Sequence, residues 1–144
     1  MTASLSFTPS RIWGTRMTFG ESVTVEISAT NFWNKTGIQL VGGRRHLMSA
    51  SGHWVDFFIP HGPDGDPSNG WYLRLFERKR RLPQENWFVL AGALDSDLST
   101  AFRIGSRCDY TALTTGELTC FANDVRGFYW NNWGHVTLTV TCTG

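Results

Sequence analysis

Apolar and polar residues alternate along three stretches of the chain, and this alternation predicts β-strands. In residues 21–29 every second position from Val23 to Ala29 is apolar, and the positions between them carry serine, threonine or glutamate. Residues 134–142 alternate threonine with valine and leucine up to Cys142, and residues 116–122 place Leu118 and Cys120 on one face. A repeat of two residues is the period of a strand with one buried face. We therefore expect three half-buried strands in these stretches.

Shorter runs extend this pattern to about eight strands, separated by glycine, proline, asparagine and aspartate. No segment shows a sustained helical period, and the one helical element that we allow is a short turn near residues 95–102. The predicted fold is all-β, a single domain over residues 1–144 that forms an antiparallel β-sandwich or jelly roll. The further strand-like runs are residues 4–8, 37–41, 53–59, 70–77 and 86–92.

Composition narrows the range of functions. The chain has 144 residues, 17% of them charged, and a formal net charge of +1, which argues against a general electrostatic hold on nucleic acid or on anionic membranes. We expect neither nucleic-acid binding nor insertion into a membrane. The first 20 residues contain no apolar run of signal-peptide length. The location in the cell stays open, since synthesis in the cytoplasm and later non-classical release are both compatible with the sequence.

Three cysteines leave two arrangements open. Cys120 and Cys142 fall on the inward faces of their predicted strands, so they form either two core thiols or a bridge. Cys108 makes the count odd, so at least one thiol is free or pairs with another chain.

Two polar segments have a structural interpretation. Residues 61–70, HGPDGDPSNG, fail the EF-hand spacing, because position 6 counted from Asp64 is Asn69 and position 12 is Leu75. We expect an exposed, turn-rich loop that forms a wall of a site. Residues 77–83, ERKRRLP, are basic, and we interpret them as a solvated hairpin loop rather than a nucleic-acid site. Nucleophile, zinc-protease and phosphate-loop motifs are absent from the sequence, and we expect no enzymatic activity.

The segment 123–134, NDVRGFYWNNWG, carries the most chemistry. It supplies one carboxylate from Asp124, the side-chain amides of Asn123, Asn131 and Asn132, and a flexible Gly127. Calcium takes six to eight oxygen ligands of these kinds. The alternative is a turn whose asparagines and aspartate bond to their own backbone.

The pattern N-D-V-x-G-x-Y-x-N-N-x-G followed by an alternating strand, within residues 116–140, resembles the LecA-like family of calcium-dependent, galactose-binding bacterial lectins. A weaker match covers residues 20–37, where an alternating strand runs into the letters WNKTG. The resemblance implies a β-sandwich lectin domain that binds galactose-type glycans through Ca²⁺ and two vicinal sugar hydroxyls. We also expect a homo-oligomer, because weak single sites gain strength by multivalency.

Carried over by position, the resemblance implies a calcium cage made by the side chains of Asp124, Asn131 and Asn132 and by the carbonyls of Phe128 and Thr36. The implied sugar contacts come from Asp124, Val125, Asn131, Asn132, His61, Asp64, Trp130 and Trp133. The two tryptophans replace small residues of the family, so they stack on the ligand, fill the site or bury against a partner subunit. A calcium-independent binding module of the same fold and a membrane-active β-sandwich remain alternatives.

Overall fold

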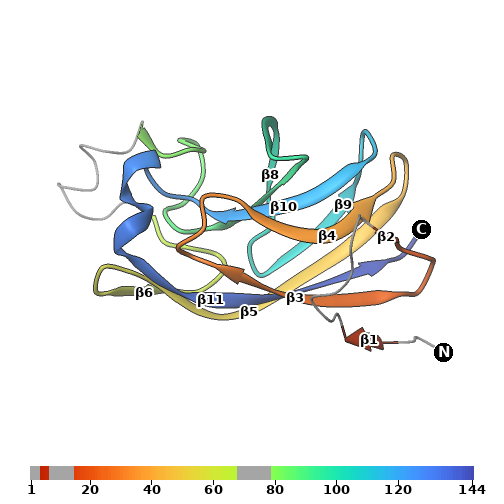
Figure 1. Ribbon diagram of the computed structural model, residues 1–144, viewed down its shortest axis with the longest axis horizontal. Helices are drawn as coiled ribbons and strands as arrows, with labels where there is room; N and C mark the ends of the chain where they lie inside the picture. The colour runs from red at the N-terminus through yellow and green to blue at the C-terminus, as the bar shows by residue number, and fades with distance from the viewer. Residues whose placement is uncertain (1–3, 7–14, 68–78) are drawn as a thin grey trace.

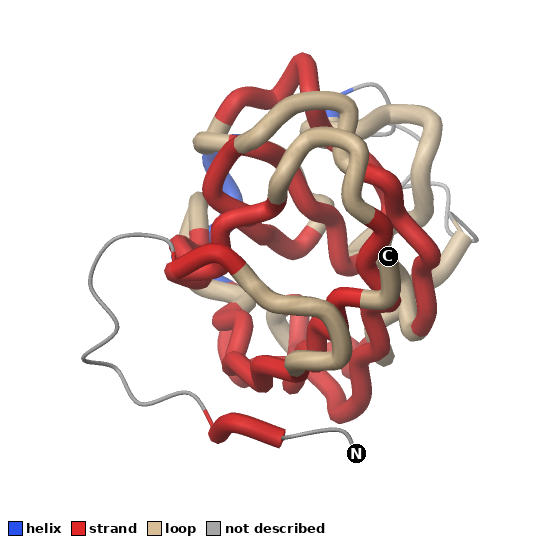
Figure 2. Tube along the Cα trace, turned by 90° about the vertical axis from the view of Figure 1, so that its right-hand side faces the viewer, coloured by secondary structure: helices blue, strands red, loops and turns tan. Residues whose placement is uncertain are grey.

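Two β-sheets packed face to face make up the protein, which is seen in a computed structural model that describes residues 4–6, 15–67 and 79–144 (Figures 1 and 2). The first sheet has the order β1-β3-β11-β5-β6, with β9 also paired to β5, and the second has the order β2-β4-β10-β7-β8. Most neighbours are antiparallel, and β1–β3 and β2–β4 are parallel. The predicted single-domain β-sandwich is confirmed. Its elements are β1 (Ser4–Ser6), β2 (Thr15–Arg16), β3 (Ser22–Ser28), β4 (Asn34–Leu40), β5 (Arg45–Asp56), β6 (Ile59–His61), β7 (Leu90–Leu94), β8 (Asp97–Arg103), β9 (Arg107–Thr111), β10 (Gly116–Ala122), the 3-10 helix η2 (Arg126–Asn131) and β11 (Asn132–Cys142).

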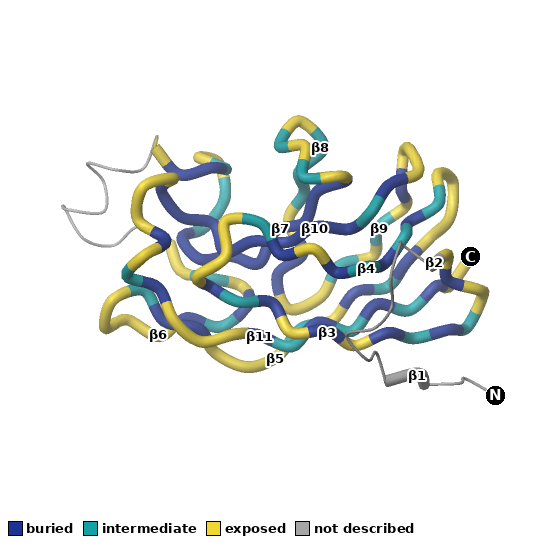
Figure 3. Tube along the Cα trace, in the orientation of Figure 1, coloured by how far each residue is buried: buried dark blue, intermediate teal, exposed yellow. Residues whose placement is uncertain are grey.

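The three alternating stretches form the centres of the two sheets. β11 pairs with β3 on one side and with β5 along its whole length on the other, while β10 lies between β4 and β7. Their apolar residues face inward and are buried between the sheets, as Figure 3 shows. Cys120 and Cys142 belong to this core, and both are free thiols. The period of two therefore predicted correctly which face of each strand is buried.

Two expectations on secondary structure were wrong. Residues 97–103 form the edge strand β8 rather than a helical turn, and the turn before it places Asp95 and Ser96 at positive φ. The expected strand 53–59 is interrupted after Asp56 by a tight turn at Phe57 and Phe58. Edge strands and tight hairpins are set by pairing with distant partners, which local alternation does not record. The expected strand 70–77 lies outside the described residues.

The basic segment differs from the expectation as well. Arg80 and Arg81 are only 8% and 5% exposed, so this part of the 77–83 run is buried rather than solvated. In the described part of the chain, no helix is long and apolar enough to cross a membrane. The C-terminus lies at one end of the sandwich, and η2, the β5–β6 hairpin and the loop 79–89 gather at the other (Figure 1).

Candidate functional site

Asp124 lies in the loop between β10 and η2 and is 1% exposed. The main-chain N–H of Val125 donates to its Oδ1 at 2.7 Å, and Nδ2 of Asn132 donates to its Oδ2 at 3.1 Å. Burial raises the pKa of this carboxyl, while these two hydrogen bonds and the nearby His61 oppose the rise. The loop thus holds an acidic side chain inside the protein, with both oxygens oriented by donors.

Two amide oxygens beside Asp124 have no hydrogen-bond donor. The Nδ2 group of Asn132 donates to Asp124 and to the carbonyl of Ala29 at 3.1 Å, which turns its Oδ1 the other way. That Oδ1 is buried without a partner, and so is Oδ1 of Asn131. An unsatisfied buried acceptor costs about 1–3 kcal/mol. A bound cation would give both oxygens a partner and remove this free-energy cost.

A second carboxylate, from Asp56, comes from the facing strand. Asp56 ends β5 and is directly opposite Asn132 in the β5–β11 ladder. Burial and the charge of Asp124 raise the pKa of Asp56 to about 6. The sequence analysis missed this residue, although a signal was present: Asp56 shares the inward phase of Met48 and Trp54 along β5. An acid on a buried face is unusual without a partner.

His61 borders the same cluster. It pairs with Trp54 at the end of the β5–β6 hairpin, is 6% exposed, and stacks on Phe88 with 4.9 Å between ring centroids. Its Nδ1 contacts the carboxylate of Asp66. The ring is close enough to Asp124 to lower that group's pKa. The expected loop wall at residue 61 is therefore a buried residue beside the carboxylates.

Asp64 lies elsewhere. Its carboxylate accepts hydrogen bonds from the main-chain N–H and the hydroxyl of Ser106, at 2.7 and 2.8 Å, and from Arg103. These bonds hold the pKa of Asp64 below its ordinary value. The structure thus ties Asp64 to the turn between β8 and β9.

The structure does not bring Thr36 to the Asp124 loop. Thr36 lies within β4, where its hydroxyl donates to the carbonyl of Leu118 at 2.6 Å. Leu118 precedes the end of β10 by four residues, or about 13 Å along a strand. The early segment that does contact the loop is 29–32: the hydroxyl of Thr30 donates to the carbonyl of Asn132 at 3.0 Å. The register between β4 and β10 is what placed Thr36 away from the site.

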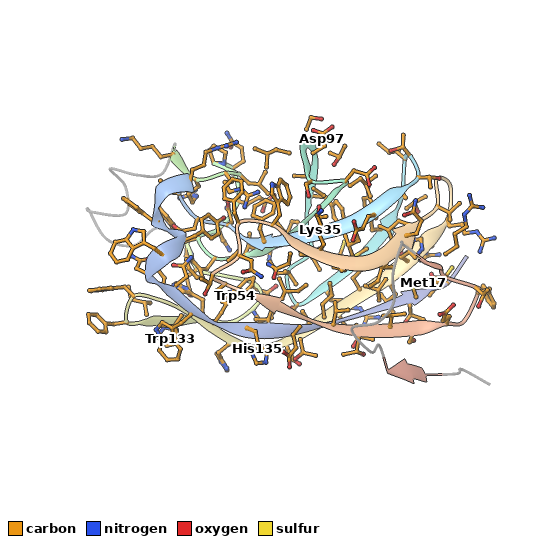
Figure 4. The ribbon with its side chains drawn as sticks, viewed as in Figure 1. Met17, Lys35, Trp54, Asp97, Trp133 and His135 are labelled. Atoms are coloured by element: carbon orange, nitrogen blue, oxygen red, sulfur yellow. The ribbon has the colours of Figure 1, made fainter. Side chains whose placement is uncertain are left out.

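The remaining predicted residues surround the loop at different depths. Val125 is 9% exposed, and its backbone forms a bridge with Arg80. Phe128 is 37% exposed and lies in η2. Trp130 and Trp133 are 76% and 59% exposed, so neither indole fills the cluster of oxygens. Figure 4 shows Trp133 beside β6 on the outside of the sandwich, whereas Trp54 lies between the sheets.

Arg81 supports the loop from beneath, and sequence reasoning missed it. Its guanidinium carbon lies 3.8 and 3.7 Å from the ring centroids of Phe32 and Phe121 and 4.3 Å from that of Trp33. Its Nη1 donates to the carbonyl of Phe32 and to the hydroxyl of Tyr129 in η2, and its main-chain N–H donates to the carbonyl of Asp124. This cation in an aromatic box joins the segment 29–32, β10 and η2.

Asn123, the residue before Asp124, is a structural clamp. Its side-chain oxygen accepts the N–H of Leu82 at 2.9 Å, and its Nδ2 donates to the carbonyls of Leu82 and Asn86, each at 2.9 Å. Its hydrogen-bonding capacity is therefore used by the backbone of 82–86. Asn123 holds the neighbouring loop in place and is not free to bind an ion.

We expect Asn123→Ala to lower the free energy of unfolding by roughly 3 kcal/mol, because it leaves several buried backbone groups unpaired. Urea unfolding measures this. The control is Asn31→Ala, which removes an exposed side chain with one hydrogen bond to Asn34 and should cost less than about 1 kcal/mol. Equal losses in the two variants would contradict the clamp.

The donor set at this loop has the chemistry that a hard cation requires. The structure brings together the carboxylates of Asp56 and Asp124 and the side chain of Asn132, whose amide oxygen has no partner, and the neighbouring Asn131 carries a second unpartnered amide oxygen. Mutual repulsion of the carboxylates and the two orphaned oxygens are both relieved by one cation with oxygen ligands. Across the described ranges no group of three or more His, Cys, Asp and Glu residues is placed to hold a metal, so the amide oxygens are essential to this set.

Comparison with known proteins gives a similarity in fold. No protein-family profile matches the sequence, and no curated protein matches it significantly. Among solved structures, the chain is similar to the EclA N-terminal domain, described as a PllA-like lectin. The TM-score is 0.59 and the sequence identity 22%, over 83% of this chain and 94% of that one. This protein therefore has the fold of a β-sandwich lectin domain.

Proposed function

We propose that this protein is a lectin that binds galactose or a related sugar through a calcium ion held by the loop between β10 and β11. The observation that carries the proposal is that this loop holds two buried amide oxygens without a donor, on Asn131 and Asn132, and that the Asn132 side chain contacts one of two repelling carboxylates. The fold shared with a lectin domain supports the carbohydrate part of the proposal.

The residues that would hold the calcium ion come from two strand ends and one helical turn. Asp124, Asn131 and Asn132 supply side-chain oxygens, and the carbonyl of Phe128 joins them from η2. Asp56 adds a second carboxylate from β5, in place of the Thr36 carbonyl that the sequence resemblance implied. Two carboxylates balance the charge of one calcium ion, and neutral oxygens complete its shell. When bound, the ion supplies positions that two neighbouring sugar hydroxyls can occupy.

The surroundings fit a carbohydrate bound at the protein surface. Trp130 and Trp133 are exposed next to Asn131 and Asn132, where an indole can pack on the apolar face of a sugar ring. A single shallow site of this kind is expected to bind a monosaccharide weakly, with Kd on the order of tens of micromolar or higher. Avidity through a homo-oligomer is therefore part of the proposal.

Isothermal titration calorimetry tests the proposal in two steps. Calcium is titrated into chelator-treated protein first, and galactose is then titrated with calcium present and again in excess chelator. We expect calcium to bind, and galactose to give heat only when calcium is present. Glucose, which differs in the orientation of one hydroxyl, serves as the matched control sugar. Galactose heat that persists in chelator would support the calcium-independent module instead, and no heat from a panel of sugars would contradict the lectin assignment.

A further inference from the structure

Most of the exposed large apolar side chains gather at one end of the sandwich. Six of the nine among the described residues lie on the β5–β6 turn and around η2, at the end opposite the C-terminus (Figures 1 and 3). Exposed apolar residues are usually scattered singly, so a cluster marks an interaction surface. We call this cluster the aromatic tip; it consists of Phe57, Phe58, Ile59, Phe128, Trp130 and Trp133, with exposed fractions of 56, 78, 40, 37, 76 and 59%.

The two halves of the aromatic tip are fixed to each other. The main-chain N–H of Phe57 donates to the carbonyl of Asn131 at 3.0 Å, and Nε1 of Trp133 donates to the carbonyl of Phe57 at 3.4 Å. The rings of Phe57 and Phe58 lie 4.0 Å apart, centroid to centroid. The tip is therefore one built surface rather than two independent loops.

The turn holds a phenylalanine where the backbone favours glycine. Phe57 has a φ of 57° and is the first central residue of a two-residue hairpin turn, a position that glycine usually occupies in turns with a positive φ there. A bulky residue in this conformation costs on the order of 1–3 kcal/mol. The ring of Phe57 is kept at this cost although it is more than half exposed to water, which points to a use at the surface.

Among the described residues of the tip segments, 56–61 and 126–134, the exposed charged side chain is Arg126. Residues 57–60 and 127–134 contain no charged side chain, and Asp56 points inward toward Asp124. Arg126, the first residue of η2, is the charged residue next to these segments, and it is exposed. Aromatic side chains flanked by a cation match the interface of a phospholipid bilayer, where rings lie among the headgroups and a cation meets the phosphates. Two copies of the chain packed tip to tip would instead bring two Arg126 side chains together.

We propose that the aromatic tip docks into the interfacial region of a phospholipid bilayer, with Phe57 and Phe58 inserted first. This contact is peripheral and requires no spanning segment. The tip shares Trp130 and Trp133 with the proposed sugar site, but Phe57, Phe58 and Ile59 lie outside that site, and contact with lipid needs neither calcium nor a glycan.

Co-sedimentation with lipid vesicles tests the proposal in excess chelator and without any glycolipid. The vesicles are phosphatidylcholine alone and phosphatidylcholine mixed with phosphatidylserine. The tip variant is Phe57→Gly with Phe58→Ser, since glycine suits the positive φ and the turn should keep its fold. The matched control is Phe19→Ser with Leu113→Ser, which removes two apolar side chains, 75% and 90% exposed, outside the tip.

We expect the wild-type protein and the control to bind vesicles. The tip variant should bind at least about tenfold more weakly, because it lacks the two phenylalanine side chains that the bilayer would bury. Lipids brominated on their acyl chains should quench the tryptophan fluorescence of the wild-type protein and not of the tip variant. Failure of the wild-type protein to bind either vesicle would overturn the proposal, and so would an equal loss of binding in the tip variant and the control. A wild-type protein that runs as a dimer on gel filtration, with a monomeric tip variant, would show that the tip binds a second copy of the chain instead of lipid.

Discussion

Asp124→Asn is expected to abolish calcium binding and, with it, the binding of galactose, while the protein stays folded. The substitution removes one of the two carboxylates proposed to hold the ion. Losing a partner outside the first coordination shell already costs about 10–100-fold in metal affinity, so loss of a ligand should exceed about 100-fold. Asparagine keeps an oxygen in the place where Val125 donates its N–H. The new amide nitrogen faces Nδ2 of Asn132, which is also a donor, so one hydrogen bond is lost. Removal of a buried charge offsets that loss, and the metal-free variant should unfold within about 1 kcal/mol of the wild type.

Calorimetry with calcium and then with galactose measures the effect, and thermal unfolding in chelator checks the fold. The matched control is Asp97→Asn, the same change of charge on an exposed carboxylate at the tip of β8 (Figure 4), which should leave both titrations unchanged. Wild-type affinity for calcium in folded Asp124→Asn would place the ion elsewhere. Lost calcium binding with galactose binding retained would separate the sugar from the metal.

Asp56→Asn is expected to have opposite effects on stability with and without calcium. In the metal-free protein, burial and Asp124 raise the pKa of Asp56 to about 6, above its ordinary value of 3.8. The folded protein therefore holds this proton more tightly than the unfolded chain does. The resulting stability is fully present below about pH 4 and is lost as the pH rises through 6. The raised pKa corresponds to about 3 kcal/mol, and solvent screening reduces this because Asp56 is only half-buried. At pH 8 the variant removes a disfavoured negative charge and should be more stable than the wild type by roughly 2 kcal/mol.

With calcium present, the order reverses, because the wild type gains the binding energy of an ion that the variant holds poorly. Thermal unfolding between pH 4 and 8, in chelator and in calcium, measures both effects. The comparison variant is again Asp97→Asn. Its carboxylate has a pKa lowered by hydrogen bonds from Ser99, so it stabilises the folded state above pH 4 and loses that effect in acid. If the difference in thermal stability between wild type and Asp56→Asn does not change with pH, the pKa of Asp56 is not raised in the folded protein.

The sequence predicted the centres of the sheets and the loop at the site, and the physical reasons are local. Alternation from Val23 to Ala29 and along β11 reflects burial of one face, and the Asp-Asn pattern of 123–134 is contiguous. Asp56 and Arg81 were missed because their roles depend on partners in other segments: β5 beside β11 for Asp56, and three aromatic elements around Arg81. The position of Thr36 depended on the register between β4 and β10, which no local pattern records.

The place of β11 in the sheet has a consequence for how this protein matures. β11 is the last strand in the chain, yet it lies in the middle of its sheet, between β3 and β5. Until the ribosome has released residues 132–142, β3 and β5 each expose an unpaired edge that β11 will later cover. Unpaired edges favour pairing with other chains. Asn132, which lies opposite Asp56, belongs to that same strand. Completion of the proposed site and protection of the two edges from aggregation should therefore occur together, when β11 is inserted.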